Sequence, residues 1–296
     1  MIVLMEQFII YLSLVILGLS FGSFAGATVW RLRARQLRAD KKAGEEIDSS
    51  EYKLLAPLMD VKQKDDRSRC LHCGHQLAWY DLIPVLSWLS IGGKCRYCRH
   101  AIGRFEPVIE IGTVIFFVAS YLLWPYDLNS SLAISQFAVW LAAGVGLAIL
   151  FAYDFKWFLL PNSVMFSVIG LASVSAILTL LQATEIGLAF INMAGAVAIL
   201  SGLYLLIYVI SKGMWVGFGD VKLGLALALL LADWRLAFLA LFLANLIGCL
   251  IVIPGMVTQK ITRQTRIPFG PLMIVGAVLA LFFGDTLLNW YFNSLF

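Results

Sequence analysis

Charged side chains are scarce in this sequence: they make up 14% of its 296 residues, while apolar residues make up 61%. Soluble domains average about 25% charged and about 45–50% apolar residues. The shortage of charge excludes an ordinary soluble enzyme, and the excess of apolar residues excludes an intrinsically disordered chain. Because a bilayer span needs about 20 mostly apolar residues, the composition indicates an all-α protein that crosses a membrane several times.

Basic residues are missing where a cleaved signal peptide would carry them. Glu6 is the only charged residue before the first apolar run, residues 8–30, and Arg31 and Arg33 follow that run. A signal peptide has the opposite charge order, so we expect a retained first transmembrane helix. The net charge of +4 is too small to favour a nucleic-acid partner, and we expect none.

Seven further apolar runs bring the expected number of transmembrane helices to about eight. They cover residues 108–124, 132–153, 162–181, 188–210, 213–232, 236–253 and 271–290. The run over 213–232 reaches span length only if it includes Asp220 and Lys222. The expected organisation is therefore a first helix over 8–30, a polar segment over 31–107, and a seven-helix membrane core over 108–292.

The distribution of basic residues predicts the orientation in the membrane. If the polar segment is cytoplasmic, 21 of the 22 Lys and Arg residues lie on the cytoplasmic side and only Arg235 lies outside. This asymmetry is what the positive-inside rule requires, so we expect a multi-pass inner-membrane protein with its N-terminus outside. The 21 residues are the 15 within 31–104 together with Lys156, Lys212, Lys222, Lys260, Arg263 and Arg266.

Four of the five cysteines form two Cys-x-x-Cys pairs in the polar segment, Cys70 with Cys73 and Cys95 with Cys98. Two such pairs at this separation are typical of a structural zinc site, in which four thiolates leave no open coordination position. We therefore predict a small cytoplasmic zinc-ribbon-like segment, with Zn²⁺ as its structural cofactor. Disulfides are disfavoured because the cytosol is reducing. One ligand could instead come from a neighbouring histidine: His72, His75 or His100.

Histidine occurs only three times, always beside the cysteines, so no Ser-His-Asp or Cys-His set is available to the membrane part. Among acidic residues outside 31–110, only Asp154 and Asp220 are expected at the cytoplasmic side of the helices. An ionisable residue at membrane depth is costly, which makes both functional candidates. Of two carboxyl groups held close together, one can activate water while the other, protonated, polarises a peptide carbonyl.

The residues around Asp220 support the same interpretation. Gly217 and Gly219 permit a close approach of backbone or substrate, and Lys222 completes the sequence Gly-Phe-Gly-Asp-Val-Lys. A structural interpretation is also open, in which each aspartate caps a helix or pairs with Lys156 or Lys222.

In their order along the chain, these motifs resemble the bacterial type IV prepilin peptidases. The resemblance covers most of the chain and includes the stretch Trp-Tyr-Asp-x-Ile-Pro-Val-x-Ser-Trp between the cysteine pairs. Its other elements are Phe21-Gly22-Ser23-Phe24 with Arg31-Leu32, the cysteine pairs, Asp154 with Pro161, Gly217 to Lys222, and Ile267-Pro268-Phe269-Gly270-Pro271. The chain departs from the family pattern at Gly26, where Asn is common, and at residues 104–107.

The resemblance implies an eight-helix inner-membrane aspartic endopeptidase, with Asp154 and Asp220 as its catalytic pair facing the cytoplasm. Such enzymes remove the leader peptide of type IV prepilins and pseudopilins, which serve pili and type II secretion. Many members then methylate the new N-terminus with S-adenosylmethionine as cosubstrate. No residue is assigned to S-adenosylmethionine, and no oligomeric state is predicted.

Three alternatives are open. Tyr153-Asp154 and Gly-x-Gly-Asp also resemble the presenilin and signal-peptide-peptidase motifs, although those families lack the cysteine pairs. A membrane thiol oxidoreductase could use the Cys-x-x-Cys pairs. A transporter could use membrane carboxylates, but the sequence has no internal repeat and no acidic residue near the middle of a span.

Overall fold

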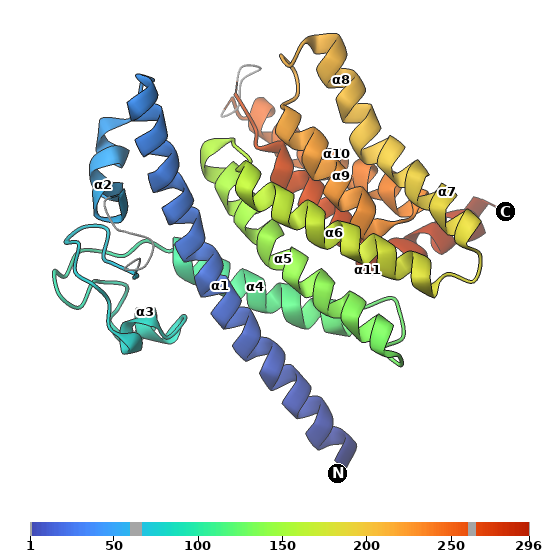
Figure 1. Cartoon of the computed structure of the whole chain (residues 1–296), viewed down its shortest axis with the longest axis horizontal. Helices are drawn as coiled ribbons and strands as arrows, with labels where there is room; N and C mark the ends of the chain where they lie inside the picture. The colour runs from blue at the N-terminus through green and yellow to red at the C-terminus, as the bar shows by residue number, and fades with distance from the viewer. Residues whose placement is uncertain (1, 60–66, 260–264, 296) are drawn as a thin grey trace. The chain divides into compact units, whose positions relative to one another are not determined.

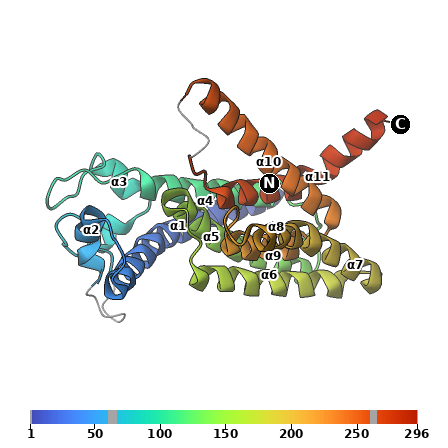
Figure 2. The same ribbon diagram turned by 90° about the horizontal axis from the view of Figure 1, so that it is seen from above.

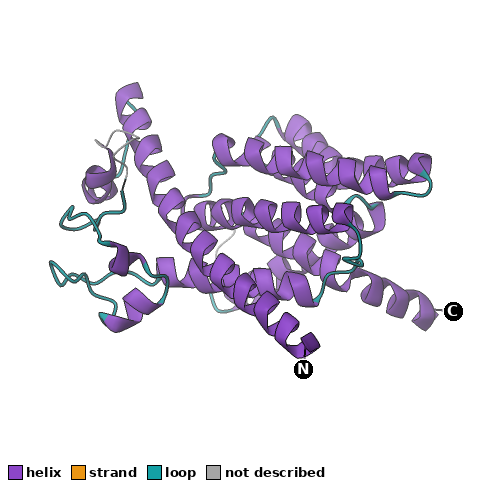
Figure 3. Cartoon of the chain, turned by 60° about the horizontal axis from the view of Figure 1, so that its bottom comes forward, coloured by secondary structure: helices purple, strands orange, loops and turns teal. Residues whose placement is uncertain are grey.

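The computed structural model describes residues 2–59, 67–259 and 265–295, and this part of the chain is almost entirely helical (Figure 3). It contains no β-strand in these ranges, only isolated bridges that pair Arg69 with Gln76 and Lys94 with Ala101. The predicted all-α class is confirmed. The chain forms two compact units, Met1–Val118 and Ala119–Phe296.

Seven helical stretches within the described residues are long and apolar enough to cross a membrane. They are α1 (Ile2–Ala43), α4 (Phe105–Leu122), α5 (Ser131–Trp157), α6 (Asn162–Gln182), the continuous stretch Ile186–Ser211, α10 (Trp234–Val257) and α11 (Phe269–Leu295). Of the basic residues that predicted the orientation, Lys62, Lys64, Lys260 and Arg263 lie outside the described residues.

The eighth expected span, over 213–232, forms the shorter helix α9 (Phe218–Leu231). Its 14 residues extend about 21 Å at about 1.5 Å per residue, less than the roughly 30 Å of a hydrocarbon layer. The helix begins late because the chain turns first: Lys212 and Gly213 have φ values of 52° and 78°. Such left-handed residues end a helix, so residues 213–217 form a connection rather than the start of a span.

In the first unit, α1 continues past the expected end of the first span at residue 30 and reaches Ala43. Its C-terminal half packs on α2 (Ser49–Met59), which follows a short turn (Figure 1). The contact is a buried apolar cluster of Ala34, Leu37, Leu55 and Met59, with Leu71 of the cysteine segment packed against it.

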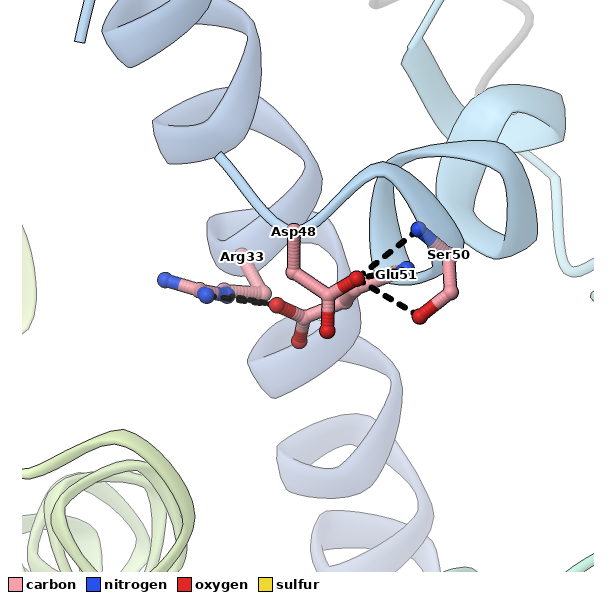
Figure 4. Close-up of polar contacts among 4 residues, drawn as sticks. All are labelled: Arg33, Asp48, Ser50 and Glu51. Atoms are coloured by element: carbon pink, nitrogen blue, oxygen red, sulfur yellow. Dashed lines mark hydrogen bonds and ion pairs between the residues drawn. The ribbon is translucent and has the colours of Figure 1, made fainter. Parts of the chain in front are cut away.

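Polar contacts fix the turn into α2 (Figure 4). The Oδ1 atom of Asp48 accepts hydrogen bonds from the Ser50 hydroxyl at 2.6 Å, from the Ser50 backbone N–H at 2.8 Å and from the Glu51 N–H at 3.3 Å. Asp48 therefore caps the free N–H groups of the first turn. These hydrogen bonds, that of the Ser50 side chain first, lower the pKa of Asp48 below its ordinary value. Glu51 accepts two hydrogen bonds from Arg33 of α1.

Helices α1 and α4 approach one another at two glycines four residues apart. A Cβ atom at Gly18 would lie 2.8 Å from the Cα of Val114, and one at Gly22 would lie 2.6 Å from the Cα of Glu110. Small residues at this spacing let two membrane helices make backbone contact. The Gly-x-x-x-Gly spacing is therefore a sequence signal from which this contact could have been predicted.

Two acidic residues of α4 attach neighbouring segments to it. The buried Glu110 accepts a 2.8 Å hydrogen bond from the backbone N–H of Val85, and Glu106 accepts one of 2.8 Å from the indole of Trp30. Val85 has a φ of 59°, which is unusual for a β-branched residue. The hydrogen bond to Glu110 thus holds the segment between the cysteine pairs against α4.

In the second unit, α9 is enclosed by other helices, and eight of its residues are buried. It packs against α6 and against the rod formed by α7 (Ile186–Val197), a π-helical turn (Ala198–Gly202) and α8 (Leu203–Ser211) (Figure 2). It also contacts α10 and α11. The closest approach is at Gly224, where a Cβ atom would lie 2.1 Å from the backbone oxygen of Leu200.

Candidate active site and candidate metal centre

Asp154 lies in the last turn of α5 and is only 5% exposed. Its Oδ2 atom accepts a 3.0 Å hydrogen bond from the backbone N–H of Gly270, in the first turn of α11. The first N–H groups of a helix have no partner within it and carry partial positive charge, so they favour an anionic oxygen. A Cβ atom at Gly270 would lie 2.8 Å from the same oxygen, so glycine is what permits this approach.

Asp220 is the third residue of α9 and is half-buried. Its Oδ2 atom accepts a 3.3 Å hydrogen bond from the N–H of Gly217, the residue that precedes the helix. Each of the two aspartates therefore receives an N–H group from the N-terminus of a helix, α11 for Asp154 and α9 for Asp220.

The two aspartates are brought together around the side chain of Leu160. A Cβ atom at Gly219 would lie 3.1 Å from one methyl group of Leu160, and one at Gly270 would lie 3.5 Å from the other. The backbone beside Asp220 and the backbone that binds Asp154 thus contact the same side chain. Asp220 directly follows Gly219, and Asp154 accepts the hydrogen bond from Gly270, so both aspartates belong to the surroundings of Leu160. Helices α5, α9 and α11 together form the site.

The alternative in which each aspartate caps a helix or pairs with a lysine holds in part. Asp220 does cap the helix to which it belongs. However, neither carboxylate forms an ion pair within the described ranges. Lys222 donates a hydrogen bond to Asn162 of α6 and lies over the rings of Phe166 and Phe218, at 5.4 and 5.2 Å from the ring centres. The lysine two residues after Asp220 therefore pairs with neither carboxyl group.

Three residues at this site have roles that the sequence did not predict. Gly270 belongs to a motif that resembles the family, but only the fold shows that its N–H meets Asp154. Leu160 carries no sequence signal. Tyr204 of α8 is 5% exposed and packs edge-on against Phe269 with 5.4 Å between ring centres.

The four paired cysteines form one cluster, whose sulfur atoms all lie within 4.8 Å of one another. Cys70 and Cys98, from different pairs, have their sulfur atoms 3.9 Å apart. Tetrahedral coordination with metal–sulfur bonds of about 2.3 Å places the sulfurs roughly 3.8 Å apart. This group could hold a metal ion.

The two Cys-x-x-Cys pairs adopt the same local structure. Cys70 N–H donates to the His75 carbonyl at 2.9 Å, and Cys95 N–H donates to the His100 carbonyl at 2.8 Å. A left-handed residue closes each turn, Gly74 with φ 71° and Arg99 with φ 59°. Repeated backbone hydrogen bonds therefore aim all four thiols at one point.

The histidines stack on other rings beside the cluster. The rings of His72 and His100 lie 3.8 Å apart, and those of His75 and Tyr97 lie 3.7 Å apart. Within the described residues, no histidine joins the four cysteines in the cluster.

Without a cation the four thiols do not ionise alike. Burial raises the pKa of Cys70 to about 12. Burial also acts to raise the pKa of Cys95, but N–H groups of Cys98 and Tyr97, together with neighbouring sulfur atoms, lower it to about 7. Four thiolates at this point need a metal cation to offset their charge.

Asp81 connects the stretch between the cysteine pairs to the second pair. It accepts hydrogen bonds from Arg96 at 2.9 Å, from the Tyr97 hydroxyl at 2.9 Å and from the Ala78 N–H at 3.2 Å. Partial burial acts to raise the pKa of Asp81, but these hydrogen bonds, that of Arg96 first, lower it overall.

Comparison with known proteins identifies the family. A family described as the bacterial peptidase A24 N-terminal domain matches residues 16–124, and the type IV leader peptidase family matches residues 141–253. The chain belongs to the type IV leader peptidase family. The first match includes the cysteine cluster, and the second includes Asp154 and Asp220.

Relatives named prepilin leader peptidase/N-methyltransferase match this chain along most of their length. The protein from Pseudomonas aeruginosa is 28% identical over 94% of this chain and 91% of its own. The protein from Aeromonas hydrophila is 29% identical over 96% of this chain and 95% of its own. The protein from Bacillus subtilis is 28% identical over 76% of this chain and 85% of its own. No solved structure matches the chain.

Family membership and the candidate spans together make this chain a peptidase and a multi-pass protein of the bacterial inner membrane. The predicted resemblance is confirmed.

Proposed function

We propose that this peptidase is an aspartic endopeptidase that removes the leader peptides of type IV prepilins and pseudopilins. The observation that carries the proposal is the convergence of Asp154 and Asp220, each bound by a helix N-terminus, with no ion-pair partner for either among the described residues. The names of the relatives supply the substrate class.

The chemistry needs one proton shared by the two carboxyl groups. The ionised carboxyl group takes a proton from a water molecule, and the water oxygen bonds to the peptide carbonyl carbon. The protonated carboxyl group donates to the carbonyl oxygen. Collapse of the tetrahedral intermediate then breaks the C–N bond. The leaving amine takes the proton that the first carboxyl group received from water, and a hydroxyl group of the intermediate returns its proton to the second carboxyl group, so the pair again holds one proton. We treat Asp154 and Asp220 as a pair that titrates together and give neither a fixed role.

The active site is proposed to face the cytoplasm, with the N-terminus of the chain outside. Asp154 at the C-terminal end of α5 and Asp220 at the N-terminal end of α9 lie at one end of the second unit. That end carries Lys156, Lys212 and Lys222, as the positive-inside rule predicts for a cytoplasmic side. The hydrolysed bond would lie where the apolar helix of a prepilin leaves the membrane.

We further propose that Cys70, Cys73, Cys95 and Cys98 hold a structural Zn²⁺. Four sulfur donors with spacing close to a tetrahedron fit zinc, and four protein ligands leave no open position for catalysis. The single cluster also disfavours the thiol oxidoreductase alternative, because a redox-active pair acts by itself, whereas here all four sulfur atoms lie within 4.8 Å of one another and suit one metal ion.

Methylation of the new N-terminus with S-adenosylmethionine is proposed only from the names of the relatives. We assign none of the described residues to that cosubstrate. Prepilins and the lipid bilayer are the proposed partners, and nucleic acid is not among them.

Mutation of each aspartate tests the peptidase assignment. The full chain, purified in detergent, would be incubated with a prepilin, and the product N-terminus would be measured by mass spectrometry with and without S-adenosylmethionine. We expect Asp154→Asn and Asp220→Asn each to abolish leader removal while the protein stays folded.

Asp233→Asn is the matched control, because Asp233 pairs with Arg235 at the start of α10 and Asn retains its capping ability. Full cleavage by both Asp154→Asn and Asp220→Asn would refute the assignment. Cleavage within the membrane-embedded part of the substrate, rather than at the leader junction, would favour the presenilin-like alternative.

A further inference from the structure

The hydroxyl group of Tyr204 is buried and makes no hydrogen bond to the residues that the structure describes. The side chain of Asn245 on α10 lies near this hydroxyl without meeting the geometry of a hydrogen bond, and the Asn245 amide donates to the Leu241 carbonyl at 2.8 Å. Buried polar groups are nearly always hydrogen-bonded, because an unpaired one costs free energy. A buried hydroxyl left unpaired in this part of the fold therefore requires an explanation.

The fold directs Tyr204 toward the first turn of α9. Ser201, three residues earlier in the π-helical turn, donates a 3.0 Å hydrogen bond to the carbonyl of Val221, the residue immediately after Asp220. One turn later, Tyr208 packs on Phe218 with ring centres 5.3 Å apart. Tyr204 thus lies between two contacts that both reach the start of α9.

Tyr204 also contacts the second helix end of the site. Its ring packs against Phe269, the first residue of α11, and the next residue, Gly270, binds Asp154. The π-helical turn just before α8 supports a functional role for this region, because such turns frequently occur at functional sites.

Asp220 offers the matching acceptor. Its Oδ2 atom is bound by Gly217, whereas its Oδ1 atom has no hydrogen-bond partner in the described part of the chain. We propose that Tyr204 is a positioning residue, whose hydroxyl donates to the free oxygen of Asp220, directly or through one water, when a substrate peptide occupies the site. This inference rests on the proposed aspartic peptidase function.

A hydrogen bond to an ionised carboxylate is stronger than one between neutral groups, particularly in a site from which water is excluded. It would hold the Asp220 carboxyl group in one orientation toward the reacting water and carbonyl, whichever member of the pair carries the shared proton. No proton is transferred from Tyr204, and Tyr204 itself need not touch the substrate.

Tyr204→Phe removes the hydroxyl and keeps the ring that packs on Phe269. Tyr208→Phe is the matched control, one turn along the same helix. With the full chain and a prepilin, we expect Tyr204→Phe to lower kcat about ten- to a hundredfold, the worth of a charge-assisted hydrogen bond. KM should stay unchanged, because the hydroxyl acts on Asp220 and not on substrate binding.

The thermal midpoint is the second measurement. Because the resting hydroxyl has no partner, Tyr204→Phe should be as stable as the unmodified chain or more stable. A lowered midpoint would assign Tyr204 a structural role and overturn the proposal. So would an unchanged kcat, or an equal loss in Tyr208→Phe. If Asp154→Asn and Asp220→Asn are inactive while Tyr204→Phe is fully active, the inference fails and the proposed function stands.

Discussion

The two sites of this protein are assembled in different ways. The cysteine cluster is built from two short turns with the same hydrogen-bond pattern, so each pair of thiols is set by about six consecutive residues. The aspartate pair is built from the ends of three helices, and each carboxylate depends on an N–H group from a helix N-terminus. The first site is locally determined, whereas the second depends on helix packing.

This difference predicts which changes damage which site. Loss of a metal should loosen the first unit and leave the helices of the second unit folded. Loss of close helix packing should damage the aspartate pair without affecting the cysteines.

Metal removal is expected to have the largest effect. Chelation, or Cys95→Ser, should make the segment between α2 and α4 sensitive to protease, because structural zinc contributes folding free energy on the order of 10 kcal/mol in small domains. The thermal midpoint of the second unit should not change. Cys249→Ser, in α10 and outside the cluster, is the control. Equal protease resistance before and after chelation would show that the segment does not depend on metal.

Gly270→Ala should have the next largest effect, now on the aspartate site. The added Cβ atom would lie 2.8 Å from the Asp154 carboxylate and displace it. Because a misplacement of about 1 Å can reduce a rate about a hundredfold, we expect kcat to fall about ten- to a hundredfold. Gly170→Ala in α6, where nothing lies within 4 Å, should keep full activity. Equal rates for the two variants would show that the Gly270 contact is unimportant.

Gly224→Ala tests the packing that places α9. Its Cβ atom would lie 2.1 Å from the Leu200 carbonyl oxygen, and a backbone atom cannot move aside as a side chain can. We expect a loss of about 1–3 kcal/mol in the free energy of unfolding, measured in detergent with denaturant. Gly112→Ala in α4 has open space around it and should not be less stable than the unmodified chain. Unchanged stability of Gly224→Ala would mean that α9 and the π-helical turn at Leu200 can move apart at little cost.

The smallest expected effect concerns Asp48, which caps α2. Its lowered pKa means that its stabilising contribution is complete above the unfolded-state pKa of about 3.9 and is lost as pH falls through the folded-state value. Amide exchange of α2 should therefore accelerate at acid pH relative to Asp48→Asn, which keeps the cap but cannot titrate. Identical pH profiles for the two proteins would contradict this role.

Much of the fold could be predicted from the sequence, because a membrane helix is specified by a long apolar run. Spans such as 132–153 and 162–181 correspond closely to α5 and α6. The exception was 213–232, where left-handed residues at Lys212 and Gly213 shorten the helix. Hydropathy carries no information about such a turn.

Some features of the candidate sites could likewise be predicted from the sequence, and others could not. The Cys-x-x-Cys spacing predicted the cluster, and the motif Gly-Phe-Gly-Asp drew attention to Asp220. The roles of Leu160, Gly270 and Tyr204 could not be predicted, because each arises from contacts between helices distant in sequence.

The sequence by itself determined the membrane class, the long apolar helices other than α9 and the four clustered cysteines, since these depend on composition and on spacing within a few residues. Only the tertiary structure decided that the backbone beside Asp220 and the backbone that binds Asp154 contact the same side chain, Leu160. Their arrangement depends on how closely α5, α9 and α11 pack, and glycines at 224 and 270 permit close approaches that a single Cβ atom would prevent.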